Sequence, residues 1–232
     1  MNTHRMAARI FGIFFLITFI SYGLGNGLVE SATNAPDILT NVFANKTQVT
    51  VGVILMALIH TFVNIGLPII MLPILKPYNE KLAYGYLGAA ITATVVLAVG
   101  AIFLLMLLPL SDEYVKAGSA IAPFFETMGF ILKKGNFFAY QIGMATWGMG
   151  GLMFCYLLYQ SKLVPRPMSV WGFTGYVILI SGTILELFGY NVGVILSIPG
   201  GLFEISLSIW LIVKGFSSSA IESRPARMIE MT

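Results

Sequence analysis

Long stretches without a charged residue dominate the chain. Such runs cover Ile10–Val29, Thr47–Leu75, Leu82–Ser111, Gly135–Ser161, Pro167–Leu185 and, interrupted only by Glu204, Leu187–Val213. A helix needs about 20 apolar residues to cross the hydrocarbon core of a membrane. None of the runs alternates with the period of a membrane-barrel strand. The pattern predicts six transmembrane helices, at about 8–29, 49–75, 82–110, 136–160, 168–189 and 193–214.

Composition agrees with this pattern. The 232 residues are 57% apolar and only 10% charged, with a mean hydropathy of +0.87. Soluble domains carry roughly 25% charged residues, and the net charge of +3 is too small for a nucleic-acid partner. The single cysteine, Cys155, cannot form an internal disulfide. We therefore expect an all-α polytopic membrane protein whose first partner is the lipid bilayer.

Lysine and arginine positions predict the orientation, because cytoplasmic loops carry the excess of both. With a cytoplasmic N-terminus, the inside segments hold nine basic residues: Arg5, Arg9, Lys76, Lys81, Lys162, Arg166, Lys214, Arg224 and Arg227. The outside loops then hold four: Lys46, Lys116, Lys133 and Lys134. Both termini are therefore expected in the cytoplasm. The alternative is a cleaved signal peptide, since Arg5 and Arg9 precede the first apolar run.

The connecting segment between the third and fourth predicted spans has a recognisable pattern. Ser111 can cap a helix with two acidic residues in its first turn, and apolar positions recur at helical spacing from Pro123 to Lys133 and Lys134. Residues 111–134 are thus expected to form an outer interfacial helix or lid, or else a packed connector. The six helices form a single domain, 1–216, and the polar segment 217–232 is expected to be a flexible cytoplasmic tail.

A short pattern occurs twice. Lys76 is followed by Tyr84-Gly85-Tyr86-Leu87-Gly88, and Lys162 by Trp171-Gly172-Phe173-Thr174-Gly175. Spans two and three would then be a parallel repeat of spans four and five. Convergence explains the match equally well, because aromatic residues suit membrane interfaces and glycines allow close packing in any inward-starting span.

Several longer segments resemble a known prokaryotic membrane family, filed as domain of unknown function 4386. They include CYLLYQSKLVPRPMSVWGFTGY at 155–176, the inner loop 73–86, the outer segments 36–49 and 113–118, and the stretch 203–216. The resemblance extends from the first span to Phe216. It implies a six-helix prokaryotic membrane protein and no particular activity. Members of the family tend to carry an acid early in the second span, where this chain has His60.

Ionisable groups within a span are costly and therefore mark candidate sites. His60 lies eleven residues into the second span from Val49, and Glu204 lies eleven residues into the sixth from Gly193. Both are then roughly 16 Å deep, near the bilayer midplane, and could meet. Asn64 lies one turn from His60 on the same face, and Trp147 of the fourth span falls at the same level.

Two further features are a possible break inside span six and an acidic residue at the outer end of span five. Pro199, Gly200 and Gly201 precede Glu204 and predict a helix break, whose half-helix N-terminus would face a ligand. The alternative is a tolerated kink with Glu204 as a packing group. Glu186 at the outer end of span five is expected to be a solvated side chain rather than part of a proton relay.

These residues allow three functional hypotheses. The chain contains no HExxH, GxSxG, P-loop or GxGxxG motif, and we expect neither a cofactor nor a metal. The first hypothesis is a small-ligand or proton-linked binding or transport protein of a prokaryotic plasma membrane. The second is a non-catalytic partner of another membrane protein, or a homo-oligomer, with an immunity, sensory or assembly role. The third and weakest is a lipid-modifying intramembrane enzyme.

Overall fold

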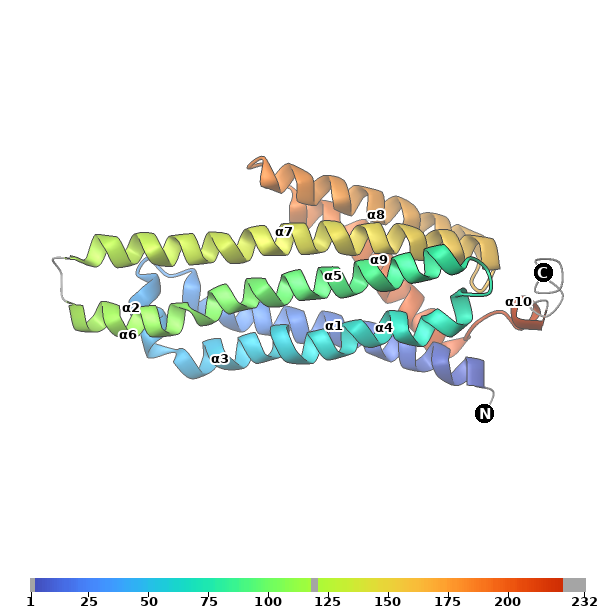
Figure 1. Cartoon of the computed structure of the whole chain (residues 1–232), viewed down its shortest axis with the longest axis horizontal. Coiled ribbons are helices and arrows are strands. Elements are labelled where there is room, and N and C mark those ends of the chain that lie inside the picture. Colours follow the sequence, from blue (N-terminus) through green and yellow to red (C-terminus); the bar gives the residue numbers. More distant parts are fainter. Residues whose placement is uncertain (1–2, 118–120, 223–232) are drawn as a thin grey trace. The chain divides into compact units, whose positions relative to one another are not determined.

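The computed structural model describes residues 3–117 and 121–222 and is helical, without a strand, within those ranges. The elements are α1 (Thr3–Thr33), α2 (Ile38–Ala44), α3 (Lys46–Ile54), the π-helical turn η1 (Leu55–Ile59), α4 (His60–Leu75), α5 (Glu80–Leu105), α6 (Leu107–Ala117), α7 (Ala122–Ser161), α8 (Arg166–Leu187), α9 (Gly193–Val213) and α10 (Ser218–Glu222) (Figure 1).

Six stretches of the described chain are long and apolar enough to cross a membrane. They are α1, the run from α3 through η1 to α4, α5 together with α6, α7, α8 and α9. The predicted all-α membrane protein with six spans is therefore confirmed. The cytoplasmic placement of both termini and the retention of the first span stay predictions, because helix length and composition do not determine them.

The connection between the third and fourth spans differs from the sequence-based expectation. Ser111 is not a cap: it lies within α6, fully buried, and its hydroxyl donates to the carbonyl oxygen of Leu108 over 2.7 Å. No separate helix ends at Lys133 and Lys134, because α7 continues through both. The ammonium of Lys133 donates to the carbonyl oxygen of Thr33, at the end of α1, over 2.8 Å and to Oδ1 of Asn34 over 3.0 Å. The location of this region at the membrane face stays a prediction.

The helices pack into two compact units, each built from separate stretches of chain. The first unit comprises residues 1–17, 63–93 and 144–232, and the second comprises 18–62 and 94–143. The first unit thus contains both ends of the chain together with α8, α9 and α10.

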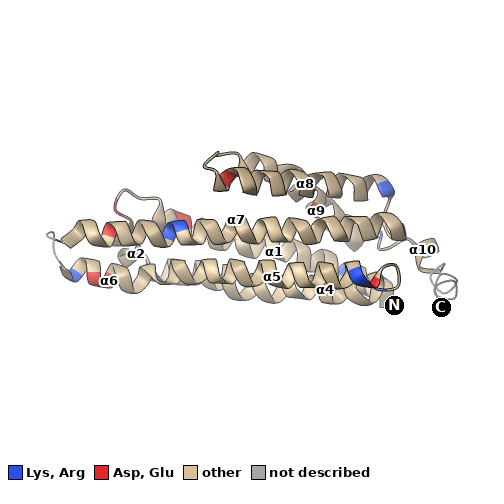
Figure 2. Ribbon diagram, turned by 45° about the horizontal axis from the view of Figure 1, so that its top comes forward, with Lys and Arg blue, Asp and Glu red and all other residues tan. Residues whose placement is uncertain are grey.

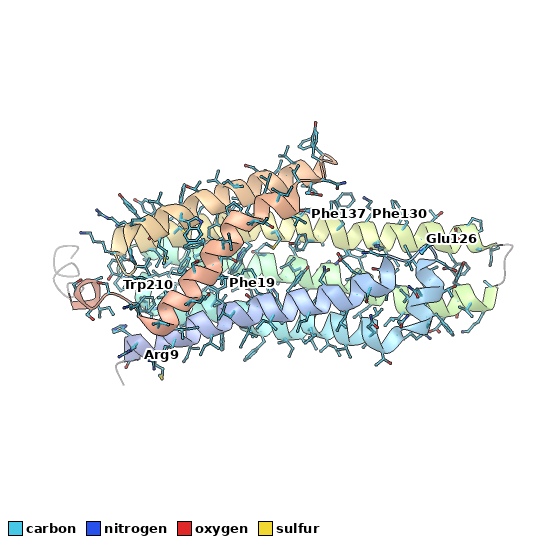
Figure 3. The ribbon with its side chains drawn as sticks, turned by 180° about the vertical axis from the view of Figure 1, so that it is seen from behind. Arg9, Phe19, Glu126, Phe130, Phe137 and Trp210 are labelled. Carbon is cyan, nitrogen blue, oxygen red and sulfur yellow. The ribbon has the colours of Figure 1, made fainter. Side chains whose placement is uncertain are left out.

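Close helix contacts hold the first unit together. α8 and α9 lie side by side (Figure 1), and a Cβ added at Gly175 would lie only 2.9 Å from the Cα of Gly200. At the other end of α9, the Nε of Arg9 donates to the carbonyl oxygen of Ile212 over 3.3 Å, and Figure 3 shows Arg9 near Trp210 there. Small residues allow such approaches between membrane helices.

The predicted helix break at Pro199, Gly200 and Gly201 is wrong. α9 runs without interruption from Gly193 to Val213 and contains all three residues. A proline removes one backbone donor, a loss that membrane helices tolerate when their neighbours pack against them. Gly200 provides the contact with Gly175 on α8 rather than a break.

The second unit contains the short helix α2 and the part of α7 that ends at Gly143. Asp37 caps α2, since its carboxylate accepts from the backbone N–H of Thr40 over 3.0 Å and from the Thr40 hydroxyl over 2.6 Å. These bonds hold the pKa of Asp37 below its ordinary value. On α7, the ammonium of Lys134 lies over the rings of Phe130 and Phe137, which Figure 3 labels.

The start of the C-terminal segment is packed in the first unit. The backbone N–H of Ser217 donates to the carbonyl oxygen of Leu163 over 2.9 Å, and the Tyr78 hydroxyl donates to the carbonyl oxygen of Ala220 over 3.1 Å. Residues 217–222 are thus hydrogen-bonded to the first unit, and the flexibility of the tail 217–232 stays a prediction. Residues 223–232 lie outside the described residues.

Candidate functional site

Glu204, in the interior of α9, is the centre of a buried hydrogen-bonded cluster. The indole Nε1 of Trp147 on α7 donates to Glu204 Oε1 over 3.0 Å. The hydroxyl of Tyr176 on α8 donates to the same oxygen over 2.6 Å. Glu204 and Trp147 are each 8% exposed, and Tyr176 is 1% exposed. Three helices of the first unit therefore converge on one carboxylate oxygen.

Glycines on neighbouring helices make room for the aromatic rings of this cluster. A Cβ added at Gly151 of α7 would lie 2.4 Å from the ring of Tyr176. A Cβ added at Gly172 of α8 would lie 2.4 Å from the ring of Phe203, which packs edge to face against Tyr176 at 6.0 Å between centroids. Because Gly151 and Gly172 carry no side chain, the rings of Tyr176 and Phe203 fit against these two positions, and the Tyr176 hydroxyl is placed accordingly.

The structure brings Trp147 and Glu204 together, as their equal depth in two spans suggests. Sequence reasoning missed Tyr176. A signal was present, because a tyrosine within a span must find a partner for its hydroxyl. The comparison of depths included His60, Glu204 and Trp147, which lie in spans two, six and four. Tyr176 lies in span five, directly after the repeated aromatic and glycine pattern, and was not compared.

Charge compensation at this cluster is incomplete. Among the described residues of the first unit, no lysine, arginine or histidine forms an ion pair with Glu204. Both hydrogen-bond donors are neutral groups, and an ionised carboxylate buried in a span is costly without a cation. The group can become neutral by taking up a proton, or it can hold a cation that these side chains do not supply.

His60 forms a different cluster, in the second unit. Its backbone N–H bonds back to the carbonyl oxygen of Leu55 and closes η1. Its Nδ1 lies 3.3 Å from the carbonyl oxygen of Thr18, and its ring packs edge to face on Tyr22 at 5.1 Å. Tyr22 packs in turn on Tyr140. Because a carbonyl oxygen can only accept, Nδ1 carries the proton of this bond, and in the neutral imidazole Nε2 is then the acceptor nitrogen.

The Nε2 atom of His60 is buried and has no hydrogen-bond partner among the described residues. The predicted pair of His60 and Glu204 joins residues of different units and stays a prediction. Asn64, one turn after His60 on α4, belongs to the first unit with Glu204 and is 3% exposed.

Glu186 has a structural role that was not expected. It is half-buried, and its Oε1 accepts from the backbone N–H of Gly193, the first residue of α9, over 2.7 Å. A Cβ at Gly193 would lie 2.8 Å from the Cγ of Glu186. Glu186 therefore caps α9 from the end of α8, where the helix dipole favours a negative charge. An acid seven residues before a helix start is not a recognised capping pattern, so the sequence could not reveal it.

The repeated glycine pattern is used differently in its two copies. A Cβ at Gly175 would meet the Gly200 backbone, whereas one at Gly88 would meet nothing within 4 Å among the described residues. Gly85 contacts the side chain of Met153, whereas Gly172 contacts Phe203. An internal duplication stays a prediction.

The described residues include no group of three or more His, Cys, Asp or Glu side chains that could hold a metal ion. Among the described residues of the spans, the carboxyl group of Glu204 and the imidazole of His60 are buried ionisable groups that could carry chemistry.

Six apolar spans around buried polar groups define an integral, multi-pass membrane protein. A family model described as "Domain of unknown function (DUF4386)" matches residues 10–215, which are most of the chain. The chain belongs to this family, as the sequence resemblance indicated. Neither the curated proteins nor the solved structures give a significant match.

Proposed function

We propose that this chain is a proton-linked binding or transport protein of a prokaryotic plasma membrane, in which the carboxyl group of Glu204 takes up and releases the proton. The observation that carries the proposal is the placement of two neutral donors, Trp147 and Tyr176, on one oxygen of Glu204 without an ion pair in its unit. Buried carboxyl groups of this kind act as proton relays in transporters.

The direct test is infrared difference spectroscopy of the reconstituted full chain across a step between about pH 5 and 8. Proton uptake at Glu204 is expected to give the C=O stretching band of a carboxylic acid. The substitution Glu204→Gln removes that band and preserves the size of the side chain. The exposed Glu30 offers a matched control, and Glu30→Gln is expected to leave the band in place.

A second experiment tests ligand binding by thermal unfolding of the protein with a panel of small metabolites and inorganic ions. A ligand at about one hundred times its dissociation constant stabilises the folded protein by roughly 2.7 kcal/mol. This stabilisation should disappear in Glu204→Gln. If wild type and Glu204→Gln give the same infrared response, and no ligand separates them in unfolding, Glu204 is a packing group and the proposal fails.

A second candidate function, a non-catalytic partner of another membrane protein or of a second copy, has one observation in its favour. Gly23 and Gly27, one turn apart on α1, have open space where a Cβ would lie, and Ile20 and Leu24 beside them are exposed. Small residues spaced by four are typical of helix–helix contacts in membranes. Gly148 and Gly151, by contrast, pack against Ile180 and Tyr176 of the same chain. Crosslinking of Gly23→Cys in native membranes distinguishes this function from the first.

A further inference from the structure

Basic side chains gather at one end of the first unit. The exposed residues Arg5, Lys76, Lys81, Lys162, Arg166 and Lys214 lie at the start of α1, in the connections α4–α5 and α7–α8, and after α9; we call them the basic rim. Figure 2 shows basic residues at the start of α8 and near the α4–α5 connection. Among the described side chains of these segments Glu80 is acidic, so six positive charges minus one negative charge leave a net charge of +5.

The C-terminal segment ties the parts of the basic rim together. Tyr78 in the α4–α5 connection is bonded to Ala220 of α10, and Leu163 in the α7–α8 connection is bonded to Ser217. Gly215, with φ of +76°, turns the chain from α9 into this segment, and a Cβ there would lie 3.7 Å from the Cγ of Arg5. Separate stretches of sequence are thereby held at one surface.

Aromatic side chains accompany these charges. The guanidinium of Arg166 lies 4.9 Å from the ring centroid of Tyr159, and the ammonium of Lys76 lies 5.3 Å from that of Tyr84. Trp171, in the second turn of α8, is 40% exposed. Exposed aromatic and basic residues together at the ends of spans are typical of the lipid headgroup level. Hydrogen bonds to Glu80 and Tyr84 raise the pKa of Lys76, which keeps it charged.

The second unit differs in charge. Its four lysines stand against five acidic residues, Glu30, Asp37, Asp112, Glu113 and Glu126, so its net charge is −1. Lys46 pairs with Asp112, and Lys116 pairs with Glu113. Within the basic rim Lys76 pairs with Glu80, and the rim keeps a net positive charge, whereas the second unit does not.

We propose that the basic rim binds the headgroups of anionic phospholipids in the leaflet that it meets. The docked C-terminal segment organises the rim by holding the two basic connections in place. Several cations around one phosphate supply the electrostatic attraction, and the neighbouring aromatic rings fix the depth of the lipid. The exposed aromatic residues beside these charges at the ends of spans favour a lipid headgroup over a nucleic acid as the anion.

The test uses the purified full chain in a neutral detergent, titrated with phosphatidylglycerol or with phosphatidylcholine of the same chain length and followed by native mass spectrometry. We expect tighter binding of phosphatidylglycerol. The double substitution Lys81→Gln/Lys162→Gln should weaken it by about fivefold for each charge removed. Lys116→Gln/Lys134→Gln removes two charges from the second unit and is the matched control, expected to bind like the wild type.

A substitution at Tyr78 distinguishes the contribution of the docked C-terminal segment from the contribution of the charges. Tyr78→Phe preserves every charge but removes the bond to Ala220, and it should weaken phosphatidylglycerol binding. Unchanged binding in this variant overturns the role of the C-terminal segment. Equal affinity for the two lipids, or an equal loss in both double variants, overturns the lipid site. If inorganic phosphate or a short RNA competes as well as phosphatidylglycerol, the rim is a general anion surface and the proposal is wrong.

Discussion

Two donors share one oxygen of Glu204, and this sharing makes their contributions interdependent. When either Trp147 or Tyr176 loses its donor, the other still reaches Oε1. Groups in one hydrogen-bonded network do not contribute additively to stability. The stability of this cluster must therefore be measured by combining substitutions rather than by adding single ones.

Tyr176→Phe keeps the ring in the space beside Gly151 and deletes only the hydroxyl. We expect the free energy of unfolding to fall by about 1–3 kcal/mol, because a buried acceptor loses its shorter bond. Unfolding of Tyr176→Phe, Glu204→Gln and the double variant in mild detergent gives the coupling energy. Strictly additive losses would show that the hydroxyl and the carboxyl group do not stabilise each other.

Asp37 provides a residue-scale prediction outside the spans. Its lowered pKa means that the cap of α2 is complete above the ordinary pKa of an aspartate, and is lost as pH falls through the lowered value. The protection factors of the amides of residues 38–44, which compare each exchange rate with that of an unstructured chain at the same pH, should therefore be high at neutral pH and fall in acid. Asp37→Asn, which can still cap the helix, should remove this pH dependence. The same acid response in both proteins would assign it to another group.

At the scale of helices, α5 and α8 share the repeated aromatic and glycine pattern but pack their glycines differently. Gly88 and Gly175 occupy the same place in the repeated pattern, yet only Gly175 faces a backbone at contact distance. A pattern of residue types predicts that helices can approach, but the neighbour is determined by the tertiary fold. The two positions therefore form a matched pair for substitution.

Gly175→Ala should destabilise the protein by about 1–3 kcal/mol, because its Cβ would press on the backbone of Gly200, which cannot rotate away. Gly88→Ala should be neutral or stabilise the protein by up to about 1 kcal/mol, since alanine favours the helix and meets open space. Thermal unfolding of the two variants checks the difference. Similar losses at both positions would mean that Gly88 also has a close neighbour.

The number of spans could be predicted from the sequence, but not all of their bounds. Charge-free runs locate the six helices, because few charges are tolerated within the hydrocarbon core. Lys133 and Lys134 were misread as a helix end, since a lysine can also satisfy its charge along a helix through a carbonyl group or an aromatic ring. Pro199 was misread as a break for a similar reason: neighbouring packing overrides local propensity.

At the scale of the whole molecule, an even number of spans requires both ends of the chain on one side of the membrane. The lysine and arginine bias predicts that this side is the cytoplasm, and the basic rim is the part of that bias that lies in the first unit. The candidate site was less predictable. The depth of each residue along its helix suggested Glu204 and Trp147. Which face of α8 turns toward Glu204 depends on tertiary packing, so Tyr176 could not be predicted.

Topology can be measured by cysteine labelling, because the native Cys155 is fully buried and should remain unlabelled. We expect Thr3→Cys and Ser218→Cys to react with a membrane-impermeant maleimide only after the cells are opened. Asn191→Cys, in the exposed turn between α8 and α9, should react in intact cells. Opposite accessibility of Thr3→Cys and Ser218→Cys would contradict six spans. Absence of the Thr3→Cys label from the mature protein would indicate that the first span is cleaved.

The π-helical turn η1 has a consequence for the length of the second span. Such a turn contains one residue more than the α-helix that it interrupts. If one of the residues Leu55–Ile59 is deleted, the backbone can return to regular geometry. The preceding segment then keeps its facing relative to His60, and Gly52 keeps its contact with Gly25 on α1. A deletion in a regular stretch of the same span would instead rotate that segment by about 100°. Single-residue gaps in the second span should therefore concentrate at this turn among sequences of the family.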